Sequence, residues 1–349
     1  MKQLEFVNFI QVAITSASIF AAVLLVSRRN TRALALLLAV FGLHMAFNFA
    51  EETGLLLNGP LITPALSLLY GPLLYLLIRG LILHDGFLRG GDFIHFLPFL
   101  LALFLTQWLT LIRIATVASL VIYSIACLRN IWLYHRATRL HRSDAAALRM
   151  NWVVAVFAGF GLLTVLDVVR MLTVAHQSPG FQQASYAISL SMIAILFGVL
   201  AYYAINRPLY FEGLTPEEFL FTQVETAASC EATGEDAKAF AAIEAMIKTS
   251  QLHRQAHLTL LDVALQTPYS EREVSRLINV VGRKNFCDYI NALRVADVAE
   301  MLSGDSTGER SILEHAFDSG FTSKSTFNSA FKKQMGVTPS AYRQNTAQS

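Results

Sequence analysis

The sequence predicts an all-α protein in two parts: about seven transmembrane helices followed by a soluble helical domain with two helix-turn-helix units. Composition is the first indication, because 54% of the 349 residues are hydrophobic and 15% are charged, against roughly 25% charged in a typical soluble domain. Charge distribution is the second. The first 207 residues hold 14 Lys or Arg and 7 Asp or Glu, whereas the rest hold 13 and 18. This contrast predicts two domains that fold in different solvents.

Long apolar stretches define the predicted spans. A spanning helix needs roughly 20 mostly apolar residues, because hydrocarbon offers the backbone no hydrogen-bond partners. Only a short turn near Arg113 separates the fourth stretch from the fifth, so counts of six or eight stay open. The first stretch has no small-residue cleavage site after it, and we interpret it as a retained span. The seven stretches are residues 6–26, 32–50, 61–83, 93–111, 114–133, 152–172 and 184–205.

Basic residues predict the orientation of these spans. They gather in the first, third and fifth loops, and short loops rich in Lys and Arg face the cytoplasm. The N-terminus is therefore expected outside and the C-terminal domain in the cytoplasm. The loop bases are Arg28, Arg29 and Arg32, then Arg79 and Arg89, then Arg129, Arg136, Arg139, Arg142 and Arg149.

A few polar residues interrupt the apolar stretches. Ionisable groups at membrane depth are costly and often functional, although residues at the headgroup boundary are tolerated without any function. Asp167 and Arg170 are three residues apart and are expected to pair with each other on one helix face. Tyr70, Tyr75 and Trp108 are interpreted as interfacial anchors. The candidates for a ligand-sensing pocket lie at the outer end of the second stretch and are His44, Asn48, Glu51 and Glu52.

Enzyme motifs are absent from the sequence. It contains no His-Glu-x-x-His metal motif, no Gly-x-Ser-x-Gly elbow and no glycine-rich phosphate loop. The three cysteines, Cys127, Cys230 and Cys287, have no metal-ligand spacing. We therefore expect no catalysis, no metal and no cofactor.

The soluble half begins after an acidic linker. We assign residues 1–207 to the transmembrane domain, 208–235 to the linker and 236–349 to the soluble domain. The linker has five glutamates and no Lys or Arg between residues 208 and 234. Such a segment would be repelled by anionic lipid and by DNA, although a plain solvated linker explains it equally well.

Two helix-turn-helix patterns follow, at residues 258–279 and 311–335. In the first, a helix containing Ala264 is followed by a short turn and a helix capped by Ser270. In the second, Gly320 suits a left-handed turn position, and Thr322 or Ser323 can cap the next helix. An apolar stripe between the two units predicts a long connecting helix.

These residues carry a specific family resemblance over about residues 252–344. The stretch Ser275-Arg-Leu-Ile-Asn279, with Asn285-Phe-Cys-Asp-Tyr-Ile-Asn291 and Arg294, resembles the first half of the AraC/XylS-type DNA-binding domain. The stretch from Gly320 to Lys333, followed by Gly-Val-Thr-Pro339, resembles its second half. Pro268 departs from the family pattern, which commonly has glycine in the first turn.

The resemblance implies that two recognition helices enter the major groove about one helical turn apart. It assigns base reading to Arg272, Ser275 and Arg276 in the first unit, and to Lys324, Ser325, Asn328 and Ser329 in the second. Lys332 and Lys333 are expected to bind phosphate. Ser329 stands where arginine is common in the family, which puts that contact in doubt.

We therefore expect a membrane-bound, sequence-specific transcription regulator in a bacterial inner membrane. Its expected partners are double-stranded promoter DNA, the lipid bilayer, an unknown signal ligand, a second copy of the chain as a homodimer, and RNA polymerase. Two alternatives stay open at this point. The membrane half could be a transporter or a transmembrane enzyme that carries a DNA-binding appendage, or it could serve only as an anchor.

Overall fold

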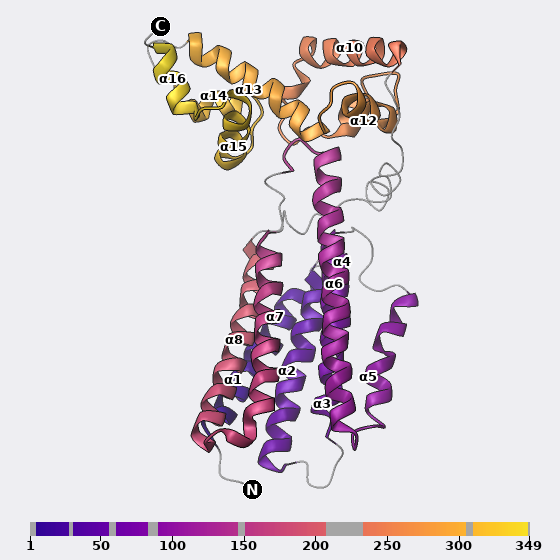
Figure 1. Cartoon of the computed structure of the whole chain (residues 1–349), viewed down its shortest axis with the longest axis vertical. Coiled ribbons are helices and arrows are strands. Elements are labelled where there is room, and N and C mark those ends of the chain that lie inside the picture. The colour runs from indigo at the N-terminus through magenta and orange to yellow at the C-terminus, as the bar shows by residue number, and fades with distance from the viewer. Residues whose placement is uncertain are drawn as a thin grey trace. The chain divides into compact units, whose positions relative to one another are not determined.

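A computed structural model describes residues 5–27, 31–55, 61–82, 90–145, 151–206, 233–304 and 310–347. Over these residues the chain is helical and contains no strand, so the all-α prediction is confirmed (Figure 1). The chain divides into two compact units. Unit 1 comprises Met1–Trp132 and Met150–Pro216, and unit 2 comprises Leu133–Arg149 and Glu217–Ser349. Hydropathy had assigned residues 133–149 to the transmembrane half.

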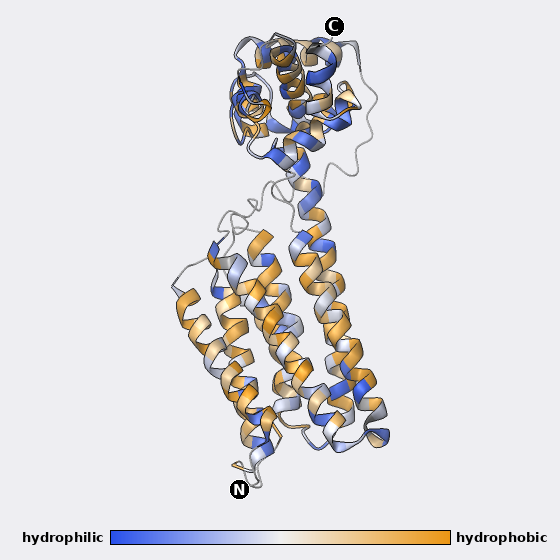
Figure 2. Cartoon of the chain, turned by 90° about the vertical axis from the view of Figure 1, so that its left-hand side faces the viewer, coloured by the Kyte–Doolittle hydropathy of each residue, from blue (hydrophilic) through white to orange (hydrophobic). Residues whose placement is uncertain are grey.

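Unit 1 is a bundle of helices that are mostly orange, and therefore hydrophobic, in Figure 2. The helices α1 and α2 approach closely at Gly42, where an added Cβ would lie 2.9 Å from Ile19 Cγ1. Small residues permit such close packing between apolar helices. The last turns of α6, from Leu133 onward, belong to unit 2. The helical elements up to residue 206 are α1 Phe6–Val26, α2 Arg32–Thr53, α3 Thr63–Leu66, η2 Ser67–Leu69, α4 Tyr70–Ile82, η3 Gly90–Phe96, α5 Leu97–Ala102, α6 Leu109–His141, α7 Asn151–Thr173, η4 Val174–His176 and α8 Pro179–Asn206.

Six helices among the described residues are long and apolar enough to cross a membrane. The stretch predicted as the fourth span, residues 93–111, is not one long helix. It comprises most of η3, all of α5 with Pro98 in its first turn, the non-helical residues 103–108 and the start of α6 at Leu109. In Figure 1 the chain nevertheless passes along the unit in alternating directions through α1, α2, α4, α5, α6, α7 and α8.

Two charged pairs lie within unit 1. Arg79, which the sequence analysis counted among loop bases, is 9% exposed. Its two terminal nitrogens donate to the two carboxylate oxygens of Asp92, each at 2.6 Å, and so join α4 to η3. The predicted pair on α7 also forms, with Arg170 Nη2 2.7 Å from Asp167 Oδ1.

Unit 2 contains two small hydrophobic cores connected by one helix, α13. The N-terminal half of α13 contributes Phe286 and Ile290 to the first core, and its C-terminal half contributes Val295 and Val298 to the second. The acidic linker, residues 208–235, lies outside the described residues up to residue 232. The helical elements of unit 2 after that point are α10 Gly234–Thr249, η6 Leu252–Arg254, α11 Leu260–Ala264, α12 Glu271–Val280, α13 Phe286–Gly304, α14 Ile312–Asp318, α15 Lys324–Met335 and α16 Pro339–Ala347.

Candidate DNA-binding surface and cavity of unit 1

The helices α11 and α12 form the first helix-turn-helix. Ser270 caps α12: its Oγ accepts from the Glu273 N–H at 3.3 Å, and Glu273 Oε2 accepts from the Ser270 N–H at 2.9 Å. Residues 265–269 of the turn include no residue with positive φ. The Thr267 hydroxyl closes this turn by donating to the Ala264 carbonyl at 3.1 Å. Pro268 is therefore compatible with the motif, because the turn needs no left-handed residue at this place.

The sequence candidates on α12 lie in three different environments. Arg272 is exposed. Ser275 is 1% exposed and accepts a hydrogen bond from Asn279, which argues against its reading a base. Arg276 forms an ion pair with Asp236 at the start of α10, with Nη1 3.1 Å from Oδ2. The Arg276 guanidinium, together with backbone hydrogen bonding at Thr233, holds the pKa of Asp236 well below its usual range.

The helices α14 and α15 form the second helix-turn-helix. Gly320 has φ +91°, as predicted for the turn, and a Cβ there would lie 2.6 Å from the Arg254 carbonyl oxygen. Of the two predicted caps, Ser323 is the N-cap of α15, and its Oγ accepts from the Thr326 N–H at 3.2 Å. The turn is therefore fixed both by its backbone conformation and by its contact with η6.

One face of α15 presents the remaining candidates. Its opposite face is buried through Phe327 and Phe331, which belong to the second core. Lys333 lies to the side, where its Nζ is 2.9 Å from Asp288 Oδ2 on α13. The spacing of the exposed residues matches one side of an α-helix. The exposed candidates on this face are Lys324, Ser325, Asn328, Ser329 and Lys332.

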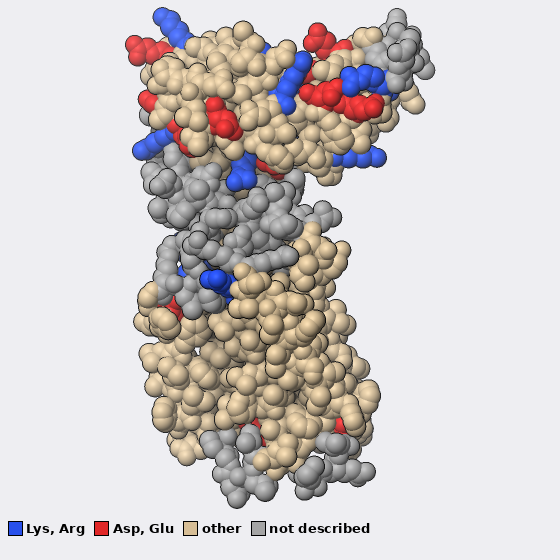
Figure 3. Space-filling model, turned by 180° about the vertical axis from the view of Figure 1, so that it is seen from behind, with Lys and Arg blue, Asp and Glu red and all other residues tan. Residues whose placement is uncertain are grey.

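Charge on unit 2 is mixed, not uniformly basic. Figure 3 shows Lys and Arg interspersed with Asp and Glu over the visible face of unit 2, and few charges over unit 1. Binding of nucleic acid by such a surface depends on where individual bases lie on it and less on its total charge.

A buried arginine joins the parts of unit 2. Arg294 on α13 is 1% exposed, and its Nε donates to the His253 carbonyl at 2.7 Å. Its Nη2 donates to the Gln255 carbonyl at 2.8 Å, and its guanidinium lies over the Phe321 ring at 5.8 Å. Burial lowers the pKa of Arg294 to about 10. The sequence analysis used Arg294 only as part of the family resemblance; a lone arginine within an apolar stripe was the available signal.

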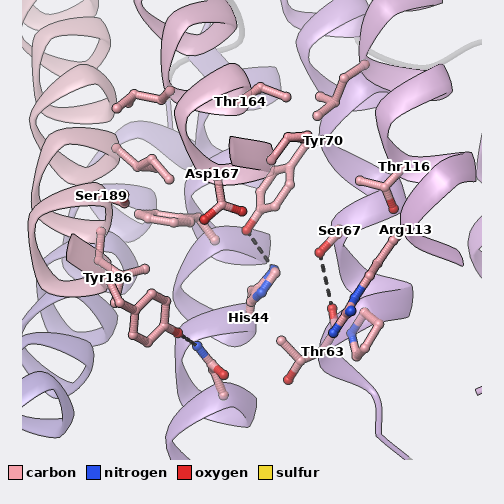
Figure 4. A pocket seen from close by; sticks show the side chains of 18 of the residues that line it. His44, Thr63, Ser67, Tyr70, Arg113, Thr116, Thr164, Asp167, Tyr186 and Ser189 are labelled. Atoms are coloured by element: carbon pink, nitrogen blue, oxygen red, sulfur yellow. Dashed lines mark hydrogen bonds between the residues drawn. The ribbon is translucent and has the colours of Figure 1, made fainter. Parts of the chain in front are cut away.

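Unit 1 contains a cavity of about 690 Å³ between α2, α3, α4, α6, α7 and α8 (Figure 4). Aromatic rings form part of its apolar wall, with Phe197 4.5 Å from Phe41 and 5.1 Å from Phe160 between ring centroids. The polar lining includes His44, Asn48, Glu52, Ser67, Tyr70, Arg113, Thr116, Asp167, Arg170, Gln182 and Tyr186. The cavity therefore offers both apolar surface and hydrogen-bonding groups, which is typical of small-molecule sites.

Hydrogen bonds fix several of these polar side chains. The Tyr70 hydroxyl is 2.9 Å from His44 Nδ1, and the Asn48 amide donates to the Tyr186 hydroxyl. The Arg170 guanidinium lies 5.1 Å from the centre of the Tyr186 ring. Tyr70, which the sequence analysis interpreted as an interfacial anchor, also lines the cavity.

Three of the four sequence candidates for sensing line this cavity. They are His44, Asn48 and Glu52, and the Glu52 carboxylate also accepts from the Gln11 amide of α1 at 2.9 Å. Glu51 does not line it. Its Oε1 accepts from the N–H groups of Ile62 and Thr63 at 2.7 and 3.0 Å, where α3 begins. Glu51 therefore holds the backbone ahead of α3, and Arg113 and Tyr186 are cavity residues that the sequence analysis did not identify.

Two helix-turn-helix units joined by one long helix define a DNA-binding domain of transcription regulators. Comparison with known proteins supports this class. A sequence family described as "Helix-turn-helix domain" matches residues 242–345. Regulatory protein SoxS of Escherichia coli K12 is 33% identical over 101 residues, which are 29% of this chain and 92% of SoxS.

Further transcription regulators are similar to the same part of the chain. SoxS of Salmonella typhimurium LT2 is 31% identical over 101 residues, which are 29% of this chain and 92% of that SoxS. Probable transcription factor PqrA of Proteus vulgaris is 28% identical over 96 residues, which are 28% of this chain and 76% of PqrA. The chain belongs to the AraC-type helix-turn-helix family of transcription regulators through its C-terminal domain. No solved structure matches the chain at a significant level.

Proposed function

We propose that this protein is a membrane-embedded transcription regulator that binds promoter DNA through α12 and α15 and senses a small molecule in unit 1. One observation carries the proposal: a single chain combines six helices of membrane-spanning length and apolarity with an AraC-type domain. DNA and RNA polymerase are then its cytoplasmic partners. A homodimer would raise the effective concentration of DNA-binding domains at a promoter.

The DNA contacts are assigned from exposure. Arg272 on α12, together with Lys324 and Asn328 on α15, reads base edges in the major groove. Lys332 contacts phosphate. Arg276 has a structural role as long as it forms the ion pair with Asp236. Asp236→Asn would weaken this pair, and DNA binding should become stronger only if the released arginine reaches DNA.

A binding experiment tests this assignment. The full-length protein in lipid nanodiscs selects sites from a genomic fragment library, and the enriched site is used in titrations. Arg272→Ala and Lys324→Ala should each weaken specific binding by about 1–3 kcal/mol and relax sequence preference at one position. Lys238→Ala, which removes an exposed lysine on α10, should leave binding unchanged. Failure of the wild-type protein to select any site would refute the proposal.

We propose that the N-terminus lies outside and unit 2 lies in the cytoplasm of a bacterial inner membrane. The loop bases and the alternating course of the helices of unit 1 in Figure 1 support this orientation. Fusions of green fluorescent protein and alkaline phosphatase after residue 58 and after residue 349 test it. Phosphatase activity is expected at residue 58 and fluorescence at residue 349, and the reverse pattern would refute the orientation.

The cavity supports the sensing role. Its apolar wall and polar lining suit a small molecule with an apolar body and a hydrogen-bonding group that reaches His44 or Asn48. A thermal-shift screen of the full-length protein in nanodiscs should find compounds that raise its melting temperature. Asn48→Ala should abolish that shift, whereas Leu166→Ala, at an exposed apolar position on α7, should keep it. If no compound stabilises the protein, unit 1 is an anchor only.

A further inference from the structure

The residues at the end of α6 form part of the interior of unit 2. We call residues 141–145 the docking segment: it comprises the last residue of α6 and the four that follow. His141 is 1% exposed, Ser143 0%, Asp144 2% and Ala145 4%. These residues belong by contacts to unit 2, together with the DNA-binding domain. They are therefore buried by that domain, although about ninety residues of sequence separate them from α10.

Backbone pairing attaches the docking segment to the first helix-turn-helix. The Ser143 N–H donates to the Leu258 carbonyl at 3.1 Å, and Arg142 forms an antiparallel bridge with Thr259. Thr259 is the N-cap of α11, the first helix of that unit. The segment thus adds a short extended pairing at the place where the first helix-turn-helix begins.

Side chains of α13 complete the contact. The Ser143 carbonyl oxygen accepts from the Asn291 amide at 3.2 Å and lies 3.3 Å from Cys287 Sγ. The Ser143 hydroxyl accepts from Arg294 Nη2 at 3.1 Å. Cys287, Asn291 and Arg294 are four and three residues apart and share one face of α13. A single residue of the docking segment therefore contacts two turns of the connecting helix.

A hydrogen bond between Asp144 and His257 reinforces this arrangement. Asp144 Oδ2 lies 2.6 Å from His257 Nδ1, and the Asp144 side chain is 3% exposed. Arg294, which contacts Ser143, also donates hydrogen bonds to the carbonyls of His253 and Gln255. Its guanidinium lies over the ring of Phe321, beside the turn of the second helix-turn-helix. Removal of the segment would leave one buried donor of Arg294 without its acceptor, and an unpaired buried polar group is destabilising.

We propose that the docking segment is an integral part of the DNA-binding domain and that α6 acts on the two helix-turn-helix units through it. The other end of the same helix contributes Arg113, Thr116 and Leu120 to the cavity of unit 1. This step rests on the proposed function: ligand binding beside these residues shifts the position of α6. The docking segment then transmits that shift to Arg294 and α13. The coupling element is a docked piece of chain, in addition to the linker at residues 208–235.

The thiol of Cys287 reports whether the segment is docked. Cys287 is 7% exposed and lies against Ser143. Burial raises its pKa to about 11, so the docked thiol reacts slowly with maleimides. The full-length protein in nanodiscs, with Cys127→Ala and Cys230→Ser so that Cys287 is the remaining thiol, gives one labelling rate per variant.

Two substitutions at Ser143 isolate the role of charge, because the introduced Lys and Glu side chains are similar in volume to each other. Ser143→Lys places a cation against Arg294 and should expel the segment. Ser143→Glu places an anion there and should keep the segment docked to a greater extent than Ser143→Lys does. We expect Ser143→Lys to speed Cys287 labelling at least about tenfold, the factor that corresponds to ~1.4 kcal/mol of lost docking free energy. It should also weaken binding of the selected DNA site. Ser340→Lys, at an exposed position on α16, is the matched control and should change neither rate nor affinity.

Wild-type labelling kinetics retained in Ser143→Lys would overturn the inference. Hydrogen exchange on the unmodified protein gives a second test that does not depend on variant folding. The Ser143 amide should be protected to the same degree as amides in the core of α13, and rapid exchange there would also overturn it. Loss of DNA binding by the wild-type protein would count against the proposed function alone, because labelling and exchange measure docking without DNA.

Discussion

The turn glycine of the second helix-turn-helix allows a quantitative prediction. Gly320 combines a left-handed φ of +91° with a close approach to the backbone of η6, where a Cβ would lie 2.6 Å from Arg254 O and 2.7 Å from Arg254 C. Gly320→Ala therefore meets two separate penalties, one of conformation and one of space. Because the obstructing atoms are backbone, no side-chain rotation relieves the contact.

The two penalties can be estimated. A left-handed conformation costs an ordinary residue roughly 1–2 kcal/mol. Forcing a methyl group into a closely packed site costs roughly another 1–3 kcal/mol. We therefore expect Gly320→Ala to lower the free energy of unfolding of unit 2 by about 2–5 kcal/mol, which is a large fraction of the stability of a small domain.

Pulse proteolysis in urea measures this loss in the full-length protein, with an antibody against a C-terminal tag reading the fraction of unit 2 that stays intact. With a slope of about 2 kcal/mol per M, the middle of the usual range, the midpoint should fall by roughly 1–2.5 M urea. Two other glycines serve as controls. Gly336 has φ +75° but nothing within 4 Å of an added Cβ, so Gly336→Ala carries the conformational penalty alone. Gly304→Ala meets neither penalty.

The expected order of midpoints is Gly304→Ala at or above wild type, then Gly336→Ala, then Gly320→Ala lowest. If Gly320→Ala were no less stable than Gly336→Ala, the contact with Arg254 would carry no cost. The close packing of η6 against the second turn would then be wrong.

Two further predictions concern charge in unit 2. Lys332→Ala should reduce the slope of log binding constant against log salt by about 0.9, the value for one lost phosphate contact. Lys333→Ala should reduce it less, because Asp288 holds that lysine; equal slopes in DNA titrations would contradict this. Hydrogen bonds from the serine caps lower the pKa of Glu273 and of Glu314 below the ordinary 4.5. The two carboxylates therefore stabilise the folded state above pH 4.5, and this stabilisation is lost as pH falls through the lowered pKa. Replacing both glutamates with Gln should make stability less dependent on pH below about 4.5, as measured by acid unfolding monitored by circular dichroism.

Local signals explain why the DNA-binding domain was largely predictable from the sequence. Ser270 and Ser311 each stand three residues ahead of a glutamate, which is the pattern of a capping box, and both boxes form. Gly320 indicated a left-handed turn that the structure contains. In each case the interacting groups lie within a few residues of one another in the sequence, so a local pattern is enough to predict the contact.

Long-range contacts were not predictable in the same way. Ser275 was assigned to base reading by its place in the family pattern, but its side of α12 faces the core. Glu51 and Glu52 are adjacent in a polar cluster, yet one holds the backbone ahead of α3 and the other lines the cavity. Hydrophobic periodicity indicates which face of a helix is buried, but it does not indicate which residues that face contacts. The docking segment was missed for the same reason, since its partners lie 113 to 151 residues away.

The discontinuous make-up of unit 2 has a consequence for how the regulator can be switched or dissected. If a protease cut the chain within residues 208–232, the hydrogen bonds of Ser143 with Leu258, Asn291 and Arg294 would still hold the C-terminal domain to the end of α6. A gene fragment that began at residue 217 would likewise lack the docking segment, which is buried within unit 2. During synthesis, the docking segment leaves the ribosome before α7 and α8, and it must wait for residues 217–349 before unit 2 is complete.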